Sequence, residues 1–195
     1  MSAVVAGAGG STGLALMRAF ASRGLISHGA RRRPSDAELP PNSHLHACDF
    51  RDEAAVEAFV EHVESTSGPV RLAVHNIGAN VRFDVFDTTE RVYRKTWELA
   101  ALSSLFFAKS IGRRMAERGE GTLIFTGATA STRGGAGFSA FAGAMGAKRH
   151  LAQSLARELS PRGVHGRTPS TKYPLVQSRC CAAHFIQCPV CASPP

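Results

Sequence analysis

The sequence has no hydrophobic run that approaches the roughly 20 residues needed to cross a lipid bilayer, so we expect no membrane-spanning helix. No basic segment followed by an apolar one precedes the first hydrophobic stretch, which makes a cytoplasmic location the expectation. Cysteine is also scarce: Cys48 stands alone before residue 180, and the other four of the five cysteines follow. This distribution argues against a secreted disulfide framework.

Acidic residues are outnumbered, because 15 aspartates and glutamates face 23 lysines and arginines, for a formal net charge of +8. The last acidic residue is Glu158, and the only dense basic run is Arg31–Arg33. Because no nucleic-acid-binding motif accompanies this charge, we expect no nucleic-acid partner. Cys188 and Cys191 have the spacing of a zinc-ligand pair, but no second such pair accompanies them, and we expect no metal site.

Hydrophobic runs alternate with helical patterns over residues 1–165, which predicts one α/β domain with a doubly wound parallel sheet. The predicted strands are Ala3–Ala6, Leu25–Ala30, His44–Asp49, Val70–Asn76 and Gly121–Thr126. The predicted helices are Thr12–Arg23, Glu53–Ser65, Thr88–Arg118 and Gly137–Leu159. The third helix follows the capping-box spacing of Asp87–Glu90.

The periodic pattern stops near residue 165. Residues 166–195 have neither strand nor helix periodicity and are rich in proline, serine and cysteine, which predicts an irregular, disordered tail. Val164-His165 could begin a sixth strand. We nevertheless expect a sheet truncated after the fifth strand and its following helix.

A glycine-rich heptapeptide, Gly7-Ala8-Gly9-Gly10-Ser11-Thr12-Gly13, lies between the first predicted strand and the first predicted helix. Glycine allows the backbone to turn tightly and to approach a pyrophosphate closely. The helix N-terminus adds free N–H groups and a partial positive charge. Strand, glycine-rich turn and helix in this order predict a dinucleotide site.

Three further strings follow in a recognisable order: Asp49 after the third strand, His75-Asn76-Ile77-Gly78 after the fourth, and Phe125–Ser131 after the fifth. With the glycine turn, they make residues 2–165 resemble the short-chain dehydrogenase/reductase family, as a divergent branch of it. The resemblance implies a Rossmann-type fold, an oxidoreductase activity and a nicotinamide cofactor.

The glycine turn fits a G-x-x-G-x-x-G variant of the family pattern through Gly7, Gly10 and Gly13. The more usual G-x-x-x-G-x-G would place its middle glycine at Ser11. The resemblance also implies that Asp49 binds the adenine amino group. Asp49 could equally cap the helix that follows it.

Arg31-Arg32-Arg33 lie 18 residues past Gly13, where an NAD-preferring site has an acidic residue for the ribose hydroxyls. No acid occurs there before Asp36, and arginine binds a 2′-phosphate with a fork of N–H donors. This favours NADP(H) over NAD(H), the alternative being a solvated basic turn. The expected cofactor-binding residues are Gly7, Gly10, Ser11, Thr12, Gly13, Arg31, Arg32, Asp49, Asn76 and Gly78.

The resemblance implies a catalytic tyrosine that donates a proton, a lysine one turn later, a serine that polarises the carbonyl and an asparagine that holds a water. In that order the positions fall on Phe141, Met145, Ala128 and Ala100. None carries the expected group, and neither Tyr93 nor Tyr173 precedes a lysine by four residues. We therefore expect no catalytic residue of this set.

Two residues near these positions have simpler interpretations. Lys148 is one turn beyond Met145 and is expected on the surface, although it could reach a ribose hydroxyl. His75 is expected to be a structural substitute for the family's residue rather than a catalyst.

Two hypotheses about function follow. The first is an oxidoreductase-family protein that binds NADP(H) but is impaired in the standard reaction. The second is a non-catalytic binding or scaffold protein that forms a homodimer, or a heterodimer with a full-length relative. The resemblance implies that the helices Thr88–Arg118 and Gly137–Leu159 form that dimer interface. A third possibility is a chain that gives no stable product.

Overall fold

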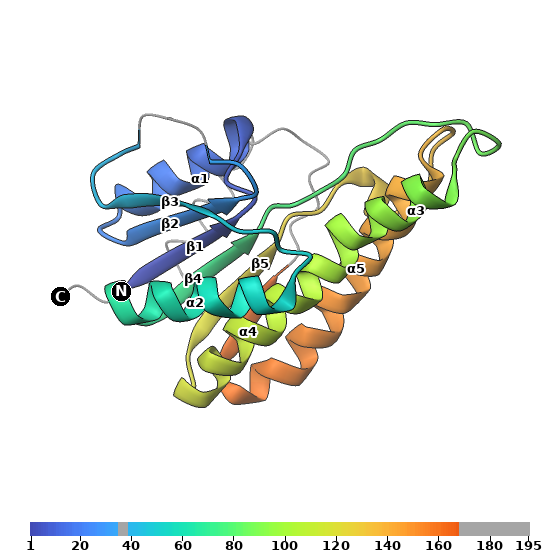
Figure 1. Ribbon diagram of the computed structural model, residues 1–195. Helices are drawn as coiled ribbons and strands as arrows, with labels where there is room; N and C mark the ends of the chain where they lie inside the picture. The colour runs from blue at the N-terminus through green and yellow to red at the C-terminus, as the bar shows by residue number, and fades with distance from the viewer. Residues whose placement is uncertain (35–38, 168–195) are drawn as a thin grey trace.

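The computed structural model describes residues 1–34 and 39–167, which form a six-stranded parallel sheet with helices on both faces (Figure 1). The strands are β1 (Ser2–Ala6), β2 (Ile26–Arg31), β3 (Ser43–Ala47), β4 (Val70–His75), β5 (Gly121–Phe125) and β6 (Val164–Arg167). The helices are α1 (Gly10–Ala21), α2 (Glu53–Ser67), α3 (Glu90–Trp97), α4 (Ser103–Arg118) and α5 (Ser139–Leu159). The strands lie in the order β3-β2-β1-β4-β5-β6.

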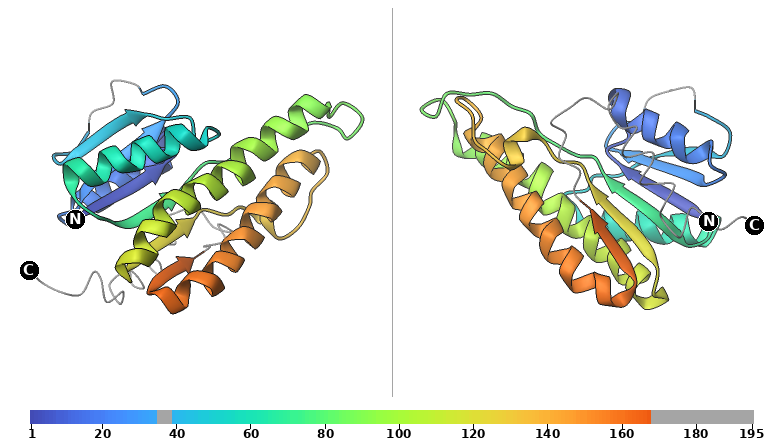
Figure 2. Two further views of the ribbon diagram at one scale, coloured as in Figure 1. Left: turned by 60° about the horizontal axis from the view of Figure 1, so that its bottom comes forward. Right: turned by 180° about the vertical axis from the view of Figure 1, so that it is seen from behind.

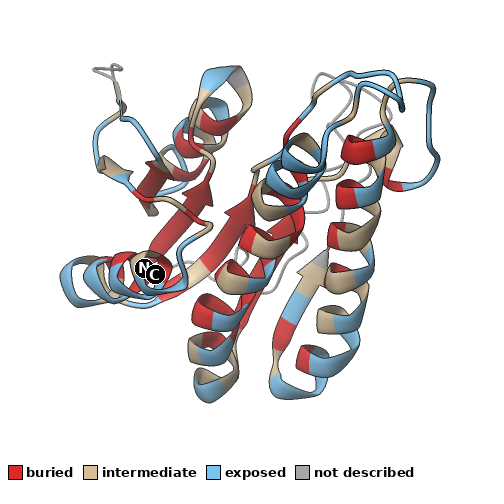
Figure 3. Cartoon of the chain, turned by 45° about the vertical axis from the view of Figure 1, so that its right-hand side comes forward, coloured by how far each residue is buried: buried red, intermediate tan, exposed pale blue. Residues whose placement is uncertain are grey.

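Helices cover both faces of the sheet, which explains why strands β1, β4 and β5 are mostly hydrophobic and buried. Helix α1 packs on one face, and α2, α4 and α5 pack on the other (Figures 2 and 3). The buried residues on the α1 side are Ala3, Val5, Ala8, Met17, Phe20, Leu72, Val74 and Ile124. Within the described ranges, no helix combines the length and the apolar character needed to cross a membrane.

The direction of strand order reverses between β1 and β4. Strands β2 and β3 extend the sheet on one side of β1, and β4 to β6 extend it on the other. The register aligns Ala6 of β1 with Ala30 of β2 and His75 of β4. The residues that follow these positions, Gly7 and Asn76 among them, therefore share one edge, where open α/β sheets bind their ligands.

The predicted parallel sheet is confirmed, and all five predicted strands form with ends displaced by at most two residues. The expected truncation after the fifth strand is wrong: β6 pairs with β5, with Val164 beside Gly121. Gly166 and Arg167, which we assigned to the tail, belong to this strand. The rest of the predicted tail, residues 168–195 with Cys188 and Cys191, lies outside the described residues.

The predicted start of the third helix at Thr88 is wrong, whereas the predicted start of the second helix at Glu53 is confirmed. Helix α3 begins after Thr89, whose hydroxyl accepts the Val92 N–H at 3.3 Å, so Asp87 does not cap it. Helix α2 is capped by Asp52, whose carboxylate accepts two backbone N–H groups of the first turn. Asp49 is therefore not the cap of this helix.

The predicted helix Thr88–Arg118 is continuous but contains a π-helical turn, Glu98–Leu102, between α3 and α4. The Ser103 hydroxyl donates to the Leu99 carbonyl oxygen at 2.5 Å, at the end of this turn. A single π-turn inside an α-helix is often found at functional sites. Here it contains Ala100, which is fully buried.

Four histidines gather where β2 and β3 pack against α2. His28 Nδ1 lies 3.0 Å from His46 Nε2, and the His28 ring stacks on that of His44 with 5.1 Å between centroids. His62 of α2 meets His46 edge-on at 5.5 Å. Burial, followed by the neighbouring imidazoles, lowers the pKa of His28 from 6.5 to about 4, and burial also lowers that of His46. The buried rings of His28 and His46 therefore favour their uncharged forms.

We expect the free energy of unfolding to fall as the pH drops from about 6.5 to about 4. The unfolded chain takes up a proton at His28 that the folded chain excludes, so stability rises with pH in this interval. Complete exclusion would be worth roughly 3 kcal/mol at pH 4, at about 1.4 kcal/mol per pKa unit. Denaturant titrations across this pH range measure the effect.

The matched variants are His28→Phe and His150→Gln. His28→Phe should flatten the dependence on pH, whereas His150→Gln changes an exposed residue and should keep it. Equal slopes in the two variants would show that the His28 corner does not set the acid sensitivity.

Candidate cofactor site and the neighbouring apolar cluster

Two close backbone contacts shape the glycine turn. A Cβ at Gly7, whose φ is +81°, would lie 2.9 Å from the Asn76 carbonyl oxygen. A Cβ at Gly13 would lie 2.6 Å from the Gly7 carbonyl oxygen. Gly10 also has a positive φ, of +57°, which other residues rarely adopt. The turn therefore leaves no room for side chains where β1, α1 and the end of β4 meet.

The N-terminus of α1 is open to an anion. It has no side-chain cap at Gly9 and no acidic residue in its first turn. Its first N–H groups and its partial positive charge are therefore not compensated locally, which suits a phosphate. Thr12 is partly buried in this turn. The side chain of Ser11 lies outside the described residues.

The end of β4 is tied to the glycine turn by Asn76. Its N–H donates to the Ala6 carbonyl oxygen at 2.8 Å, and its Nδ2 donates to the Gly7 carbonyl oxygen at 3.2 Å. Gly78 follows, with the Phe141 ring 4.0 Å from the position of an added Cβ. The structure thus brings Gly7, Asn76 and Gly78 together between α1 and α5.

Four arginines line one cavity of about 570 Å³ beside the turn: Arg31, Arg32, Arg33 and Arg51. Arg31 is the last residue of β2, and its Nη1 lies 3.6 Å from the position of a Cβ added at Gly9. The Cys48 N–H donates to the Arg31 carbonyl oxygen at 3.1 Å, which brings the loop after β3 to this cavity. The predicted Arg31 and Arg32 are therefore adjacent to the open end of α1.

Sequence reasoning did not identify Arg51 as part of this cavity. Arg51 Nε donates to both carboxylate oxygens of Asp49, at 3.0 and 3.2 Å, and Nη2 donates to Oδ2 at 2.5 Å. Hydrogen bonding to Arg51 lowers the pKa of Asp49, so this carboxylate stays ionised. The sequence did offer one indication of this pair, because oppositely charged residues two positions apart in a loop can hydrogen-bond to each other.

The four positions assigned to the catalytic set lie together. Ala100 comes from the π-turn, Ala128 from the end of β5, and Phe141 and Met145 from α5. Ala100, Phe141, Ala144 and Met145 are buried in one cluster, with Ala128, Ala130 and Phe138 packed against them. The space is filled by apolar side chains, none of which can donate or accept a proton. We refer to these seven residues as the apolar cluster.

The described tyrosine does not replace the missing acid. The hydroxyl oxygen of Tyr93 lies 3.2 Å from the position of a Cβ at Gly143, in the contact between α3 and α5. The Tyr93 side chain is 49% exposed, and it is not part of the apolar cluster. Tyr173 lies outside the described residues.

Lys148 is buried, so its expected place on the surface is wrong. Its Nζ donates to the carbonyl oxygens of Ile77 at 3.0 Å and His75 at 3.3 Å, on either side of Asn76. Desolvation lowers the pKa of this amine from 10.5 to about 7. The sequence did not indicate that Lys148 is buried, because lysine side chains are usually exposed. Here the two carbonyl oxygens accept hydrogen bonds from its amine and make burial possible.

His75 is fully buried beneath the same segment. Its Nε2 lies 2.9 Å from the Ser103 hydroxyl oxygen, and burial, followed by the nearby Lys148, holds its pKa well below 6.5. An uncharged ring bonded to a helix hydroxyl agrees with the structural role we expect. Within the described ranges, no three histidine, cysteine, aspartate or glutamate residues are grouped to hold a metal ion.

We expect the free energy of unfolding to rise as the pH increases from about 7 to about 9. The unfolded chain holds a proton on Lys148 up to pH 10.5, whereas the folded chain releases it near pH 7, so deprotonation favours the folded state. The slope should reach at most about 1.4 kcal/mol per pH unit. Above pH 9 the raised pKa of Cys48 opposes this trend, which sets the upper limit.

Lys148→Met should remove the rise, and Lys95→Met, at a residue with an exposed ammonium, should retain it. Chemical denaturation over this pH range measures both. A wild-type curve that is flat or falling between pH 7 and 9 would contradict the assignment to Lys148.

Comparison with known proteins gives a consistent result. The chain is 27% identical over 118 residues to 2-dehydro-3-deoxy-D-gluconate 5-dehydrogenase of Pseudoalteromonas atlantica, a match covering 60% of this chain and 46% of that protein. It is 27% identical over 168 residues to 3-oxoacyl-[acyl-carrier-protein] reductase FabG of Escherichia coli, covering 83% and 68%. The chain therefore spans less than half of the first relative and about two thirds of the second.

A solved structure of a short-chain dehydrogenase from Rhodopseudomonas palustris superposes with a TM-score of 0.86 at 34% identity, covering 98% of this chain and 94% of that one. The sequence also matches the short chain dehydrogenase family over residues 1–168, which is most of the chain and includes all six strands. On the fold, the glycine turn and these matches, the chain belongs to the short-chain dehydrogenase/reductase family of oxidoreductases.

Proposed function

We propose that this chain binds NADP(H) in preference to NAD(H), and that it does not carry out the tyrosine-dependent reaction of its family. The observation that carries the first part is the cavity lined by Arg31, Arg32, Arg33 and Arg51 beside the open N-terminus of α1. The observation that carries the second part is the apolar cluster.

The charge of the cavity supports a 2′-phosphate. Four guanidinium groups line the cavity, and among the described carboxylates Asp49 is paired with Arg51 while Glu98 also acts electrostatically on Arg51. An NAD-binding site needs an acceptor for two ribose hydroxyls at the end of β2, and arginine has only donors. A phosphate, by contrast, matches the planar fork of an arginine. The pyrophosphate would then lie at the start of α1, and the Asn76–Gly78 segment would face the nicotinamide half.

The apolar cluster supports the second part. Carbonyl reduction needs a proton donor beside the hydride donor. Phe141 has no ionisable group and Met145 has no charge, while both side chains are packed inside the cluster. Lys148 is one turn away, but its donors are directed at two backbone carbonyls. The site therefore retains the means to bind a dinucleotide without the proton relay.

We expect Arg31→Ala/Arg32→Ala to weaken NADPH binding about 10- to 100-fold, because each charge-assisted hydrogen bond contributes roughly 1.5–3 kcal/mol. NADH binding should change little, since the lost donors would serve the 2′-phosphate alone. Fluorescence enhancement of NADPH or calorimetry gives both dissociation constants. Arg23→Ala is the matched control, because Arg23 is exposed and bonds only its own helix through the Ala19 carbonyl.

Two outcomes would overturn the proposal. Wild-type protein with no NADPH binding, or with equal affinity for NADH, would refute the cofactor assignment. Consumption of NADPH with 3-oxoacyl or keto-sugar-acid compounds, the classes named by the relatives, would refute the catalytic part. Escherichia coli FabG serves as the positive control in that assay.

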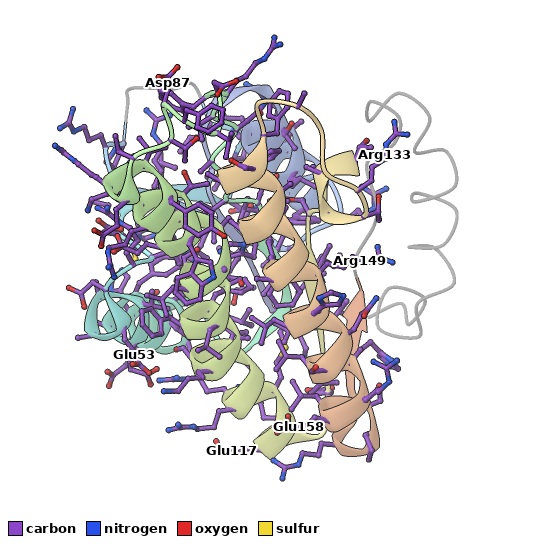
Figure 4. The ribbon with its side chains drawn as sticks, turned by 90° about the vertical axis from the view of Figure 1, so that its right-hand side faces the viewer. Glu53, Asp87, Glu117, Arg133, Arg149 and Glu158 are labelled. Carbon is purple, nitrogen blue, oxygen red and sulfur yellow. The ribbon has the colours of Figure 1, made fainter. Side chains whose placement is uncertain are left out.

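A second candidate function, a dimerising scaffold, is favoured by one surface feature. Tyr93, Trp97 and Leu105 are 49%, 42% and 37% exposed on the continuous helix formed by α3, the π-turn and α4. Helices α4 and α5 lie side by side, and the labelled Glu117 and Glu158 mark the polar lower part of this surface (Figure 4). The exposed apolar residues lie toward the opposite end of the helix pair.

We expect Trp97→Lys to reduce self-association, or association with a full-length relative, because a charge replaces apolar area that the interface would bury. Sedimentation velocity and co-purification measure the two cases. Phe86→Lys is the control, at a 96% exposed residue of the loop before α3. Wild-type protein that is monomeric and does not pair with a relative would rule out this function.

A further inference from the structure

Arg51 comes from a different part of the chain than the other three arginines of the cavity. Arg31 ends β2 and is followed by Arg32 and Arg33, whereas Arg51 lies in the loop between β3 and α2. The parallel pairing of β2 with β3 brings the two segments together, with Arg31 opposite Ala47 in the register. A ligand in the cavity would therefore be held from two sides.

The contact with Asp49 fixes one edge of the Arg51 guanidinium. It uses the Nε–H and one Nη2–H, and the Arg51 backbone N–H also donates to Asp49 Oδ1 at 3.1 Å. A guanidinium has five N–H donors. Two on Nη1 and one on Nη2 are left to form a second fork, and Arg51 is among the residues that line the cavity.

The same contact occupies Asp49. Both carboxylate oxygens accept N–H groups of Arg51, and the Asp49 side chain is 35% exposed. The family resemblance gave this aspartate a direct role at the adenine amino group. In this chain, its two oxygens are already bonded to Arg51, so a direct role would require the pair to separate.

We propose that Arg51 is a specificity-determining residue for the 2′-phosphate of the adenosine ribose, and that Asp49 is the positioning residue that aims it. This inference rests on the proposed NADP(H) function and adds a second wall to the phosphate site. Asp49 neutralises one of four positive charges, so the five residues together keep a net charge of +3 for a phosphate of about −2.

The test compares 2′,5′-ADP with 5′-AMP, which differ by the 2′-phosphate. Arg51→Met should weaken binding of 2′,5′-ADP at least about tenfold and leave 5′-AMP within about twofold, because only the phosphate loses a donor. The ratio of the NADH and NADPH dissociation constants should fall by the same factor. Arg51→Lys, which keeps the charge but not the fork, should fall between Arg51→Met and the wild type.

The role of Asp49 is tested by Asp49→Asn in the wild type and in the Arg51→Met variant. If Asp49 aims the guanidinium, Asp49→Asn should weaken binding of 2′,5′-ADP when Arg51 is present and should not weaken it when Arg51 is absent. Equal losses in the two backgrounds would show that Asp49 does not act through Arg51. Thermal melting of each variant separates loss of binding from loss of fold.

Several results would overturn this inference. Arg51→Met with wild-type affinity for 2′,5′-ADP would remove Arg51 from the phosphate site. Tighter binding of 5′-AMP by Arg51→Met, with no loss of affinity for 2′,5′-ADP, would mean that Arg51 only blocks a direct contact between Asp49 and adenine. Wild-type protein that binds neither 2′,5′-ADP nor NADPH would instead refute the proposed function. Binding that depends on Arg31 and Arg32 but not on Arg51 would refute this inference alone.

Discussion

The contact between the glycine turn and the end of β4 is the constraint on which the rest of this structure depends. A side chain at Gly7 would collide with the Asn76 backbone, so no larger residue fits there unless the backbone moves. In return, Asn76 Nδ2 donates a hydrogen bond to the Gly7 carbonyl oxygen. This contact fixes the start of α1 relative to the sheet at the point where strand order reverses. A dinucleotide site needs both the helix N-terminus, which binds the pyrophosphate, and the reversal of strand order, which opens a crevice beside it.

Lys148 stabilises the contact between Gly7 and Asn76 by holding the backbone on either side of Asn76. By donating to the carbonyls of His75 and Ile77, it holds the two peptide groups that flank Asn76. A buried ammonium without a carboxylate would be costly, and the amine instead has a pKa of about 7, at which its neutral form still supplies two N–H donors. The segment therefore keeps its position without an ion pair, at the expense of stability at low pH.

The sequence predicts the sheet well because β1, β4 and β5 are buried on both faces and consist mostly of apolar residues. Strand β6 was not predicted in this way, because it has only four residues, including a glycine and a histidine, and forms through its pairing with β5. The glycine turn was predictable because its conformation is set locally. Arg51 and Lys148 were not, because their roles come from residues that β-sheet pairing and helix packing bring close.

The site divides into two halves of opposite character along one edge of the sheet. The half at β2 and β3 is rich in charge, with four guanidinium groups around a cavity, and the half between β5 and α5 is filled by apolar side chains. Binding energy and chemistry are separable on this fold because they come from different strand ends. The arginine cavity and the apolar cluster share no hydrogen bond or ion pair among the described residues, so a substitution in one does not directly break a contact of the other.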